Sequence, residues 1–245
     1  MKNLLALTLQ NKHITQSIFC QKSAEVADIY LKGIIHADYG VGAADLRGAF
    51  NEAAGADVLM HVNSPGGDVF EGREMQAVIA GYPGKVTAII EGLAASAATF
   101  VAMSCAEVSM LKGSRFMIHN GMTMAFGNKA EMKAAFDMLA SFDIELAAEY
   151  AAKTNGDVAQ MTAWMDAETW FNADQALEHG FINKINSNSQ NMSALSEWDL
   201  SAYANAPARP AKTAPEPPPA PEHITQEHRE FLNRKLRLSE IATHQ

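Results

Sequence analysis

The sequence predicts an α/β domain with a mainly parallel sheet, followed by a Pro-rich tail. Three observations support this fold class. Strand-like and helix-like segments alternate along most of the chain, which is typical of parallel sheets with crossover helices. Hydrophobic residues make up 48% and charged residues 19% of the 245 residues, as in globular rather than disordered or coiled-coil proteins. Seven of the nine prolines fall between positions 207 and 221, where the composition favours extended chain.

The expected elements follow from hydrophobic periodicity. Short apolar runs bounded by turn residues are expected as strands, and longer amphipathic segments as helices. In order, we expect a strand at 28–35, a helix at 43–54, a strand at 56–62, a helix at 71–80, a strand at 85–90, a small-residue helix at 96–103, short strands at 106–110 and 115–118, and a helix at 129–153. The last helix is predicted to begin after Asn128, a favourable N-cap residue, and to end before Gly156.

Composition divides the chain into four segments. The folded domain is expected at 27–187, preceded by an N-terminal segment at 1–26. A Ser/Asn- and Pro-rich flexible linker is expected at 188–222, because it contains too little apolar surface to offset the entropy of ordering. Residues 223–245 form either a C-terminal helix capped by Thr225 or a frayed tail.

Charge and cysteine usage exclude several classes of protein. The net charge of −9 gives no basic surface for nucleic acids or anionic membranes. Cys20 and Cys105 have neither metal-ligand nor disulfide-framework spacing, so reduced thiols are expected. The most apolar stretch, 86–103, is interrupted by Glu91 and is too short for a membrane span, and no signal peptide is visible. These features predict a soluble intracellular protein.

Two loops follow predicted strands at their carboxyl ends, where open parallel sheets bind ligands. The first contains Asn-Ser-Pro-Gly-Gly at 63–67, whose glycines allow main-chain N–H groups to approach an oxyanion, although these residues also suit an ordinary turn. The second places Ser96 among small residues where a helix begins, so its hydroxyl would be accessible near the positive end of the helix dipole. Simple helix packing is the alternative explanation for Ser96.

A serine nucleophile needs a base, and His119 is the best placed of the eight histidines. It ends an apolar strand just before a polar turn, whereas His61 lies within a strand and His36 borders a loop. The other histidines occur in polar or terminal contexts: His13, His179, His223, His228 and His244. The sequence contains no Walker loop, G-x-G-x-x-G motif or metal-ligand spacing, so no cofactor and no metal are expected.

Four motifs together resemble the Clp protease proteolytic subunit family, and more closely the Clp-related head maturation (prohead) proteases of tailed bacteriophages and prophages. They occur in the family order at 63–67, 92–97, 117–120 and 168–176, and the resemblance spans residues 27–185. It implies the Clp peptidase/crotonase-like fold for a serine peptidase domain at 27–187. It also implies self-association into rings, such as stacked heptamers, that interlock through the helix at 129–153.

The resemblance also implies roles for individual residues. Ser96 would be the nucleophile and His119 the general base, with the N–H groups of Gly67 and Ala97 forming the oxyanion hole. The third triad member departs from the family pattern, because Glu168 stands where the family has aspartate. Glutamate can orient an imidazole as aspartate does, and Asp166 is the alternative orienter.

The implied function is a serine endopeptidase that processes phage capsid, scaffold or portal proteins during head maturation. It would act inside the assembling prohead, in the cytoplasm of the bacterial host, and the tail would serve as a tether or as a self-cleaved segment. An ATP-driven unfoldase is a further possible partner, but residues 1–24 do not clearly match the family's axial loops.

Three other functions compete with this interpretation. A crotonase-type acyl-CoA enzyme would not need the Ser96 and His119 pair, and nothing in the sequence suggests an adenine-nucleotide site. A signal-peptide-peptidase-like Ser/Lys enzyme would need a catalytic lysine and a membrane anchor, and neither is convincing. A non-catalytic, ring-forming assembly or scaffold module is opposed by the joint presence of Ser96, His119 and a suitably placed carboxylate, although fold alone does not decide activity.

Overall fold

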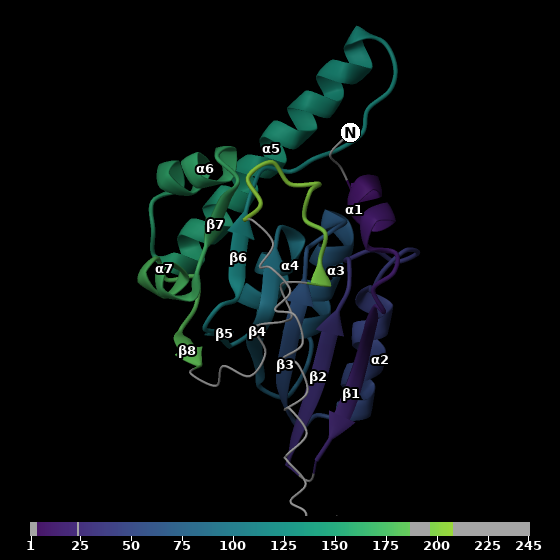
Figure 1. Cartoon of the computed structure of the whole chain (residues 1–245), viewed down its shortest axis with the longest axis vertical. Coiled ribbons are helices and arrows are strands. Elements are labelled where there is room, and N and C mark those ends of the chain that lie inside the picture. The colour runs from purple at the N-terminus through teal and green to yellow at the C-terminus, as the bar shows by residue number, and fades with distance from the viewer. Residues whose placement is uncertain (1–3, 24, 187–196, 208–245) are drawn as a thin grey trace, which may run out of the picture. The chain divides into compact units, whose positions relative to one another are not determined.

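A computed structural model describes residues 4–23, 25–186 and 197–207. Helices and strands alternate as expected (Figure 1). The elements are α1 (Leu4–Asn11), β1 (Ser17–Lys22), β2 (Val26–Lys32), α2 (Ala43–Ala53), β3 (Asp57–Ser64), α3 (Val69–Ala80), β4 (Val86–Ala95), α4 (Ala97–Met103), β5 (Glu107–Leu111), β6 (Arg115–Ile118), α5 (Lys129–Thr154), α6 (Val158–Asp166), β7 (Thr169–Phe171), α7 (Ala173–Glu178) and β8 (Lys184–Asn186).

The described strands form one eight-stranded sheet that is mostly parallel. Its main order is β1-β2-β3-β4-β5-β8, with β6 and β7 branching from β4. All the pairs within this sheet are parallel except β1 with β2 and β6 with β7. The predicted α/β class with a mainly parallel sheet is therefore confirmed.

Strand β4 changes partner along its length, and this change forms the site. Its first part, Thr87–Ile90, pairs with β5, whereas Leu93–Ala95 pairs with β6. On its other side, the register with β3 shifts between Val62 and Ser64. The carboxyl ends of β3, β4 and β6 consequently meet, which is where open α/β sheets bind ligands.

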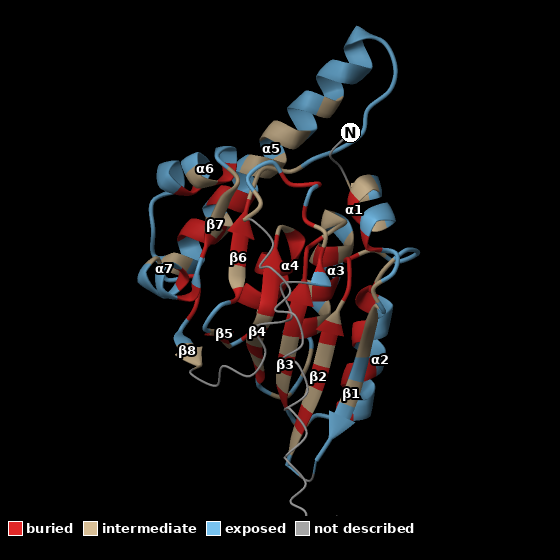
Figure 2. Cartoon of the chain, viewed as in Figure 1, coloured by how far each residue is buried: buried red, intermediate tan, exposed pale blue. Residues whose placement is uncertain are grey.

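The main core lies between the sheet and the helices α2, α3 and α4, which cover one of its faces (Figures 1 and 2). All seven residues of α4 are buried. A smaller cluster of buried residues packs around the end of β4 and includes Leu7, Leu93 and Trp198. The site is therefore supported by packed side chains on both sides of β4.

Helix α5 is buried only towards its C-terminal end, and its first half extends away from the sheet (Figure 2). Asn128 caps it as predicted, accepting a 2.8 Å hydrogen bond from the Ala130 amide, while Glu131 accepts one of 2.6 Å from the Asn128 amide. Asn155, in the left-handed region, ends it just before Gly156.

Several elements differ from the expectation. Helix α3 begins at Val69 rather than at 71, because the Asp68 side chain caps it by accepting from the Glu71 amide at 2.8 Å. Strand β4 continues past residue 90 to Ala95, because β6 supplies a new partner. The N-terminal segment, for which no helix or strand was predicted, contains α1 and the edge strand β1.

Cys20 and Cys105 are free thiols. None of the helices in the described ranges is long and apolar enough to span a membrane.

The prediction of a flexible linker at 188–222 is wrong for its described part, residues 197–207. Trp198, Leu200 and Tyr203 are buried there, because they fill the apolar surface beside the end of β4. The rest of that range and the helix predicted at 223–245 lie outside the described residues.

Candidate active site

Ser96 stands at the junction of β4 and α4, with φ of 53° and ψ of −126°. A positive φ is uncommon for a residue with a side chain and is maintained only where the surrounding structure holds it. Here the Ser96 amide donates to the Met117 carbonyl at 2.9 Å, and the Ser96 carbonyl accepts from the amide and hydroxyl of Thr99 at 2.9 and 2.6 Å. The hydroxyl is thus carried on a strained but firmly held turn.

His119 follows β6, whose pairing with the end of β4 brings the imidazole beside Ser96. Nε2 of His119 and Oγ of Ser96 are 2.7 Å apart, and the hydroxyl donates this hydrogen bond when the imidazole is neutral. Burial lowers the pKa of His119 to about 4, and the negative charge of Glu168 acts in the opposite direction. The imidazole is therefore neutral at pH 7, the form that accepts a proton.

Glu168 lies on the turn between α6 and β7, with φ of 47°. Its carboxylate accepts hydrogen bonds from the amides of Ala204 at 2.9 Å and Asn205 at 2.6 Å, and from Nε1 of Trp170 at 3.4 Å. These donors fix the carboxylate near His119, close enough for its charge to raise the pKa of the imidazole. The structure shows no hydrogen bond between Glu168 and Nδ1 of His119.

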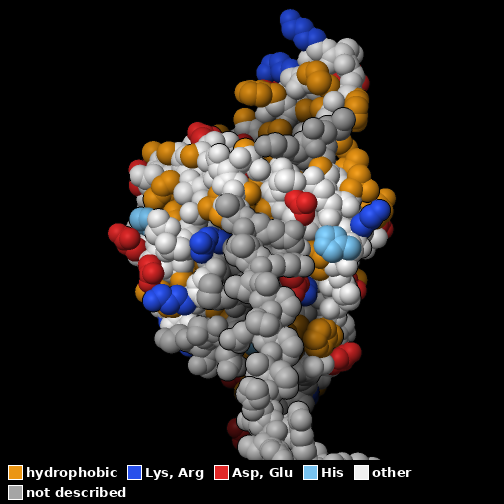
Figure 3. Space-filling model, viewed as in Figure 1, with side chains coloured by type: hydrophobic (Ala, Val, Ile, Leu, Met, Phe, Trp, Pro, Cys, Tyr) orange, Lys and Arg blue, Asp and Glu red, His pale blue; other side chains and the backbone are white. Residues whose placement is uncertain are grey.

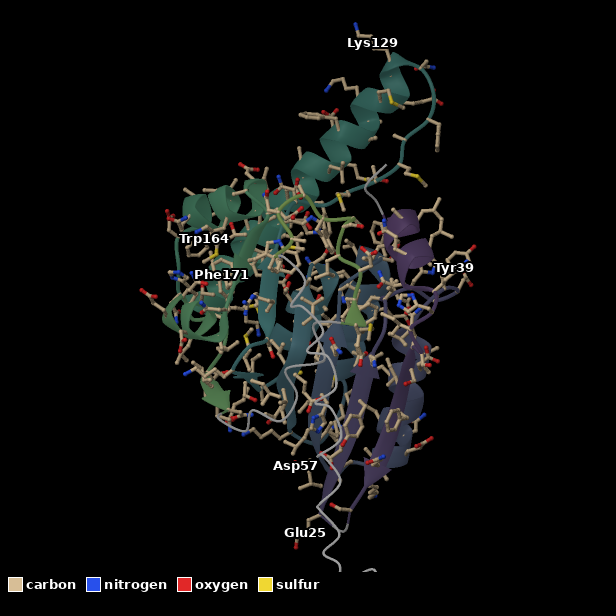
Figure 4. All side chains as sticks on the ribbon, viewed as in Figure 1. Glu25, Tyr39, Asp57, Lys129, Trp164 and Phe171 are labelled. Carbon is tan, nitrogen blue, oxygen red and sulfur yellow. The ribbon has the colours of Figure 1, made fainter. Side chains whose placement is uncertain are left out.

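Asp166, the alternative orienter, ends α6 and accepts a 2.7 Å hydrogen bond from Nδ2 of Asn120. It therefore binds the residue after His119 and makes no hydrogen bond to the imidazole. Trp164 and Phe171, whose ring centroids are 5.2 Å apart edge to face, pack together across this turn (Figure 4). The aromatic contact holds the turn that carries both acids.

The glycine pair of the first loop lies against Ser96. A Cβ on Gly66 would be 2.4 Å from the Ala95 carbonyl oxygen, so only glycine allows this approach. The Gly66 carbonyl accepts from the Ile35 amide at 2.9 Å, and the Asp68 amide donates to the Ile35 carbonyl at 2.7 Å. Ile35 and Gly67 thus form a parallel β-bridge, in which the hydrogen bonds to Ile35 come from the residues on either side of Gly67. The N–H of Gly67 therefore points away from Ile35.

A cavity of about 270 Å³ adjoins Ser96 and His119. Much of its lining is apolar and comes from α1, α3, α4, α5, the loop after His119 and the segment near residue 203. The lining includes Leu4, Leu7, Phe70, Phe100, Met122, Met124, Met138, Leu139, Phe142, Leu146 and Tyr203. The cavity can receive an apolar side chain next to the serine hydroxyl.

Residues 197–206, which were expected within the linker, form part of this site. Tyr203 packs edge-on against His119 with ring centroids 5.4 Å apart, and the next two amides bind Glu168. One feature of the sequence could have indicated that this segment is buried. Large apolar residues occur in Trp-Asp-Leu-Ser-Ala-Tyr at 198–203, between the Ser/Asn-rich run and the prolines.

His61, the histidine predicted within a strand, lies on β3 and away from Ser96. Its Nδ1 is 2.7 Å from Oε1 of Glu91 and its Nε2 is 3.0 Å from Oδ1 of Asp28, while Tyr30 stacks on its ring. Burial acts to lower the pKa of His61, but the hydrogen bonds and charges of the two carboxylates raise it overall. These residues form a polar bridge across three strands.

The chain is similar to known proteins over much of its length. The model of the Clp protease family matches residues 43–189. The ATP-dependent Clp protease proteolytic subunit of Streptococcus thermophilus is 30% identical over 148 residues, which cover 55% of this chain and 70% of that protein. Subunit 2 of Treponema pallidum is 29% identical over 175 residues, covering 69% and 87%, respectively. The subunit of Bacteroides thetaiotaomicron is 30% identical over 133 residues, covering 54% and 60%.

Proposed function

The chain belongs to the Clp protease family, and from this premise we propose that it is a serine endopeptidase with Ser96 as nucleophile and His119 as general base. The observation that carries the proposal is the 2.7 Å hydrogen bond between the serine hydroxyl and the buried imidazole. Acyl transfer to serine requires such a pair, in which the base is neutral and in contact with the nucleophile.

The reaction would proceed through an acyl-enzyme. Nε2 of His119 takes the proton from Oγ of Ser96 as the oxygen attacks the peptide carbonyl, and the resulting imidazolium gives that proton to the leaving amine. Water then attacks the ester by the same base catalysis. Glu168 would be the third member, because its negative charge acts on the imidazole and would stabilise the imidazolium.

The N–H groups of Gly67 and Ala97 would stabilise the tetrahedral oxyanion. Gly67 turns its N–H away from Ile35 and lines the cavity together with Ser96, and Ala97 begins α4 directly after the nucleophile. Main-chain donors fixed in advance require no reorganisation as the charge develops, which is the basis of oxyanion stabilisation.

We further propose that the active protein is a ring-shaped homo-oligomer. Large apolar side chains are exposed on the projecting part of α5 and on the loop before it: Met122, Met124, Phe126, Met132, Phe136, Met138 and Ile144. Figure 3 shows hydrophobic side chains gathered on this projection. An exposed apolar patch of this kind is typical of an interface, and contact with α5 of another copy would cover it.

The proposed substrates are capsid, scaffold or portal proteins of a phage, cleaved inside the assembling prohead. The proposal rests on the resemblance of the four motifs to phage head maturation proteases. Because the cavity beside Ser96 is lined mainly by apolar side chains, we expect cleavage to follow an apolar residue of the substrate. Incubation with capsid precursor should yield fragments that are absent with Ser96→Ala.

A second candidate is a general peptidase that works with an ATP-driven unfoldase. The name ATP-dependent Clp protease proteolytic subunit, carried by the relatives, favours it. The two candidates differ in their need for ATP: a head maturation protease would cleave its capsid substrate alone, whereas the second candidate would degrade folded substrates only with ATP and its unfoldase.

The first test is intact-mass analysis after treatment with a fluorophosphonate probe. We expect one adduct on the wild-type protein and none on Ser96→Ala or His119→Ala. Ser104→Ala, which removes a hydroxyl at the other end of α4, and His36→Ala are the matched controls and should be labelled as the wild type is. Absence of an adduct on the folded wild-type protein would instead favour the non-catalytic assembly module.

A further inference from the structure

Residues 197–206, here called the strap, connect the separate parts of the active site. The strap lies beyond residues 43–189, the part matched by the family model. Its buried side chains, Trp198, Leu200, Ala202 and Tyr203, belong to the cluster around the end of β4. The strap is therefore packed into the domain rather than laid loosely over it.

The first half of the strap is anchored by hydrogen bonds to buried asparagines. Nε1 of Trp198 donates to Oδ1 of Asn63 at 2.9 Å, directly before the glycine loop. Asn11 of α1 donates to the Asp199 carbonyl at 2.9 Å and accepts from the Asp199 amide at 2.7 Å. Buried polar groups that satisfy one another in this way specify a single arrangement of the chain.

Tyr203 lies between the base and the glycine loop. Its ring meets the His119 ring edge to face, at 86° and 5.4 Å between centroids, and its hydroxyl donates to the carbonyl of Pro65. Burial, followed by the charge of Glu168, raises the pKa of the phenol. The phenol is therefore a protonated donor that ties the position of the loop to that of the imidazole.

The strap also holds the acid. Two successive amides, those of Ala204 and Asn205, donate to the two carboxylate oxygens of Glu168 at 2.9 and 2.6 Å. Nδ2 of Asn205 in addition donates to the Ala167 carbonyl at 2.8 Å. These donors support Glu168 at a positive φ, a conformation that needs such support.

We propose that the strap is a built-in part of the catalytic apparatus, with Tyr203 as the positioning residue that aligns His119 with the glycine loop. The inference rests on the proposed serine peptidase function and adds a component to it. Its physical basis is that acyl transfer depends on sub-ångström placement of base, acid and oxyanion donors, and neighbouring side chains must hold these groups in place. Tyr203 contacts the base, His119, and its hydroxyl binds the loop that carries the proposed oxyanion donor Gly67. The residues next to Tyr203 bind the acid, Glu168.

The test compares full-length Tyr203→Phe and Tyr203→Ala with wild type, by the rate of fluorophosphonate labelling of Ser96 between pH 3 and 9. Tyr82→Phe is the matched control, because Tyr82 also donates its hydroxyl to a main-chain carbonyl, that of Ala56 at 2.8 Å, but lies outside the site. Tyr203→Phe should be labelled about tenfold more slowly with an unchanged pH midpoint, since the ring still covers the imidazole.

Tyr203→Ala should be labelled about a hundredfold more slowly. Its pH midpoint should also move upward, because water would reach His119 and relieve the burial that lowers its pKa. Ser96, Tyr203 and Glu168 face the imidazole, and Ser96 and Glu168 are retained in both variants, so the upward shift reports the uncovered ring. A residue that only stabilised the fold would leave the midpoint unchanged.

Several outcomes would overturn the inference. Labelling of Tyr203→Ala at or above the wild-type rate would show that the strap is a passive or inhibitory cover. If thermal unfolding shows that Tyr203→Ala is not folded, Tyr203→Phe decides, and equal rates for Tyr203→Phe and Tyr82→Phe reject the positioning role. Failure of the proposed function is distinguishable, because wild-type protein would then carry no adduct at Ser96.

Discussion

The charge state of a single imidazole sets the pH range over which this site can react. His119 has a pKa lowered to about 4 by burial, against an ordinary value of 6.5. A neutral imidazole is required to take the serine proton, so reactivity is lost only as the pH falls through the lowered value. We expect the acid limb of fluorophosphonate labelling to have its midpoint well below 6.5. A midpoint at or above 6.5 would contradict the burial of the base.

The acid beside this imidazole is tested by Glu168→Gln. Removing the negative charge should lower the pKa of His119 further, since that charge raises it, and should slow labelling by about a hundredfold because the imidazolium loses its partner. The matched variant is Asp166→Asn, which alters the contact with Asn120 and should have a much smaller effect. The reverse order of effects would make Asp166 the orienter.

The close approach of Gly66 to the Ala95 carbonyl leaves no space for a side chain at this position. Gly66→Ala places a Cβ 2.4 Å from the Ala95 carbonyl at a φ of 87°, so we expect it to reduce stability by about 1–3 kcal/mol and to abolish labelling. Gly48→Ala, where no atom lies within 4 Å of the new Cβ in helix α2, should stabilise the protein by about 0.5–1 kcal/mol. Urea unfolding of both variants measures the contrast. An unaffected Gly66→Ala would mean that the loop does not lie against Ser96.

At the scale of elements, strands β2, β3 and β4 are joined by one titratable bridge. His61 on β3 binds Asp28 of β2 and Glu91 of β4, and its folded-state pKa is raised overall. A raised pKa means that the protonated form stabilises the fold, fully below the unfolded pKa and decreasingly as the pH rises through the folded value. The melting temperature of wild type should therefore fall from pH 6 to 8 by more than that of His61→Gln. Parallel curves for the two proteins would reject this linkage.

The same elements show what the sequence can and cannot predict. Strand β3, an apolar run that ends at turn residues, and helix α5, which begins after the N-cap residue Asn128, lie close to where they were expected. The three-residue strands β7 and β8 carry no period of their own, because pairing with β6 and β5 defines them. Ser96 and His119 became candidates in the sequence because each follows an apolar strand, whereas the change of partner along β4 that brings them together depends on tertiary contacts.

The packing of the strap was not predictable for a related reason. Its composition, between a Ser/Asn-rich run and prolines, is typical of a linker. Its order comes from burial of Trp198 and Tyr203 against residues far away in the sequence, including Leu7, Ile34 and Met117. Such contacts contribute to stability only once the sheet has formed, so the apolar residues at 198–203 indicate burial but not the residues against which they pack.

At the scale of the whole molecule, the exposed apolar side chains of α5 predict assembly. Phe136 and Ile144 are 69% and 68% exposed, so changing either to lysine removes no core contact. If α5 interlocks two rings, Phe136→Lys or Ile144→Lys should about halve the assembled mass in sedimentation velocity, because burying a lysine in an apolar interface is unfavourable. Tyr39→Lys, at a side chain 65% exposed and remote from α5, is the matched control and should sediment as wild type (Figure 4). A monomeric wild-type protein, or variants of unchanged mass, would show that α5 does not join copies of this chain.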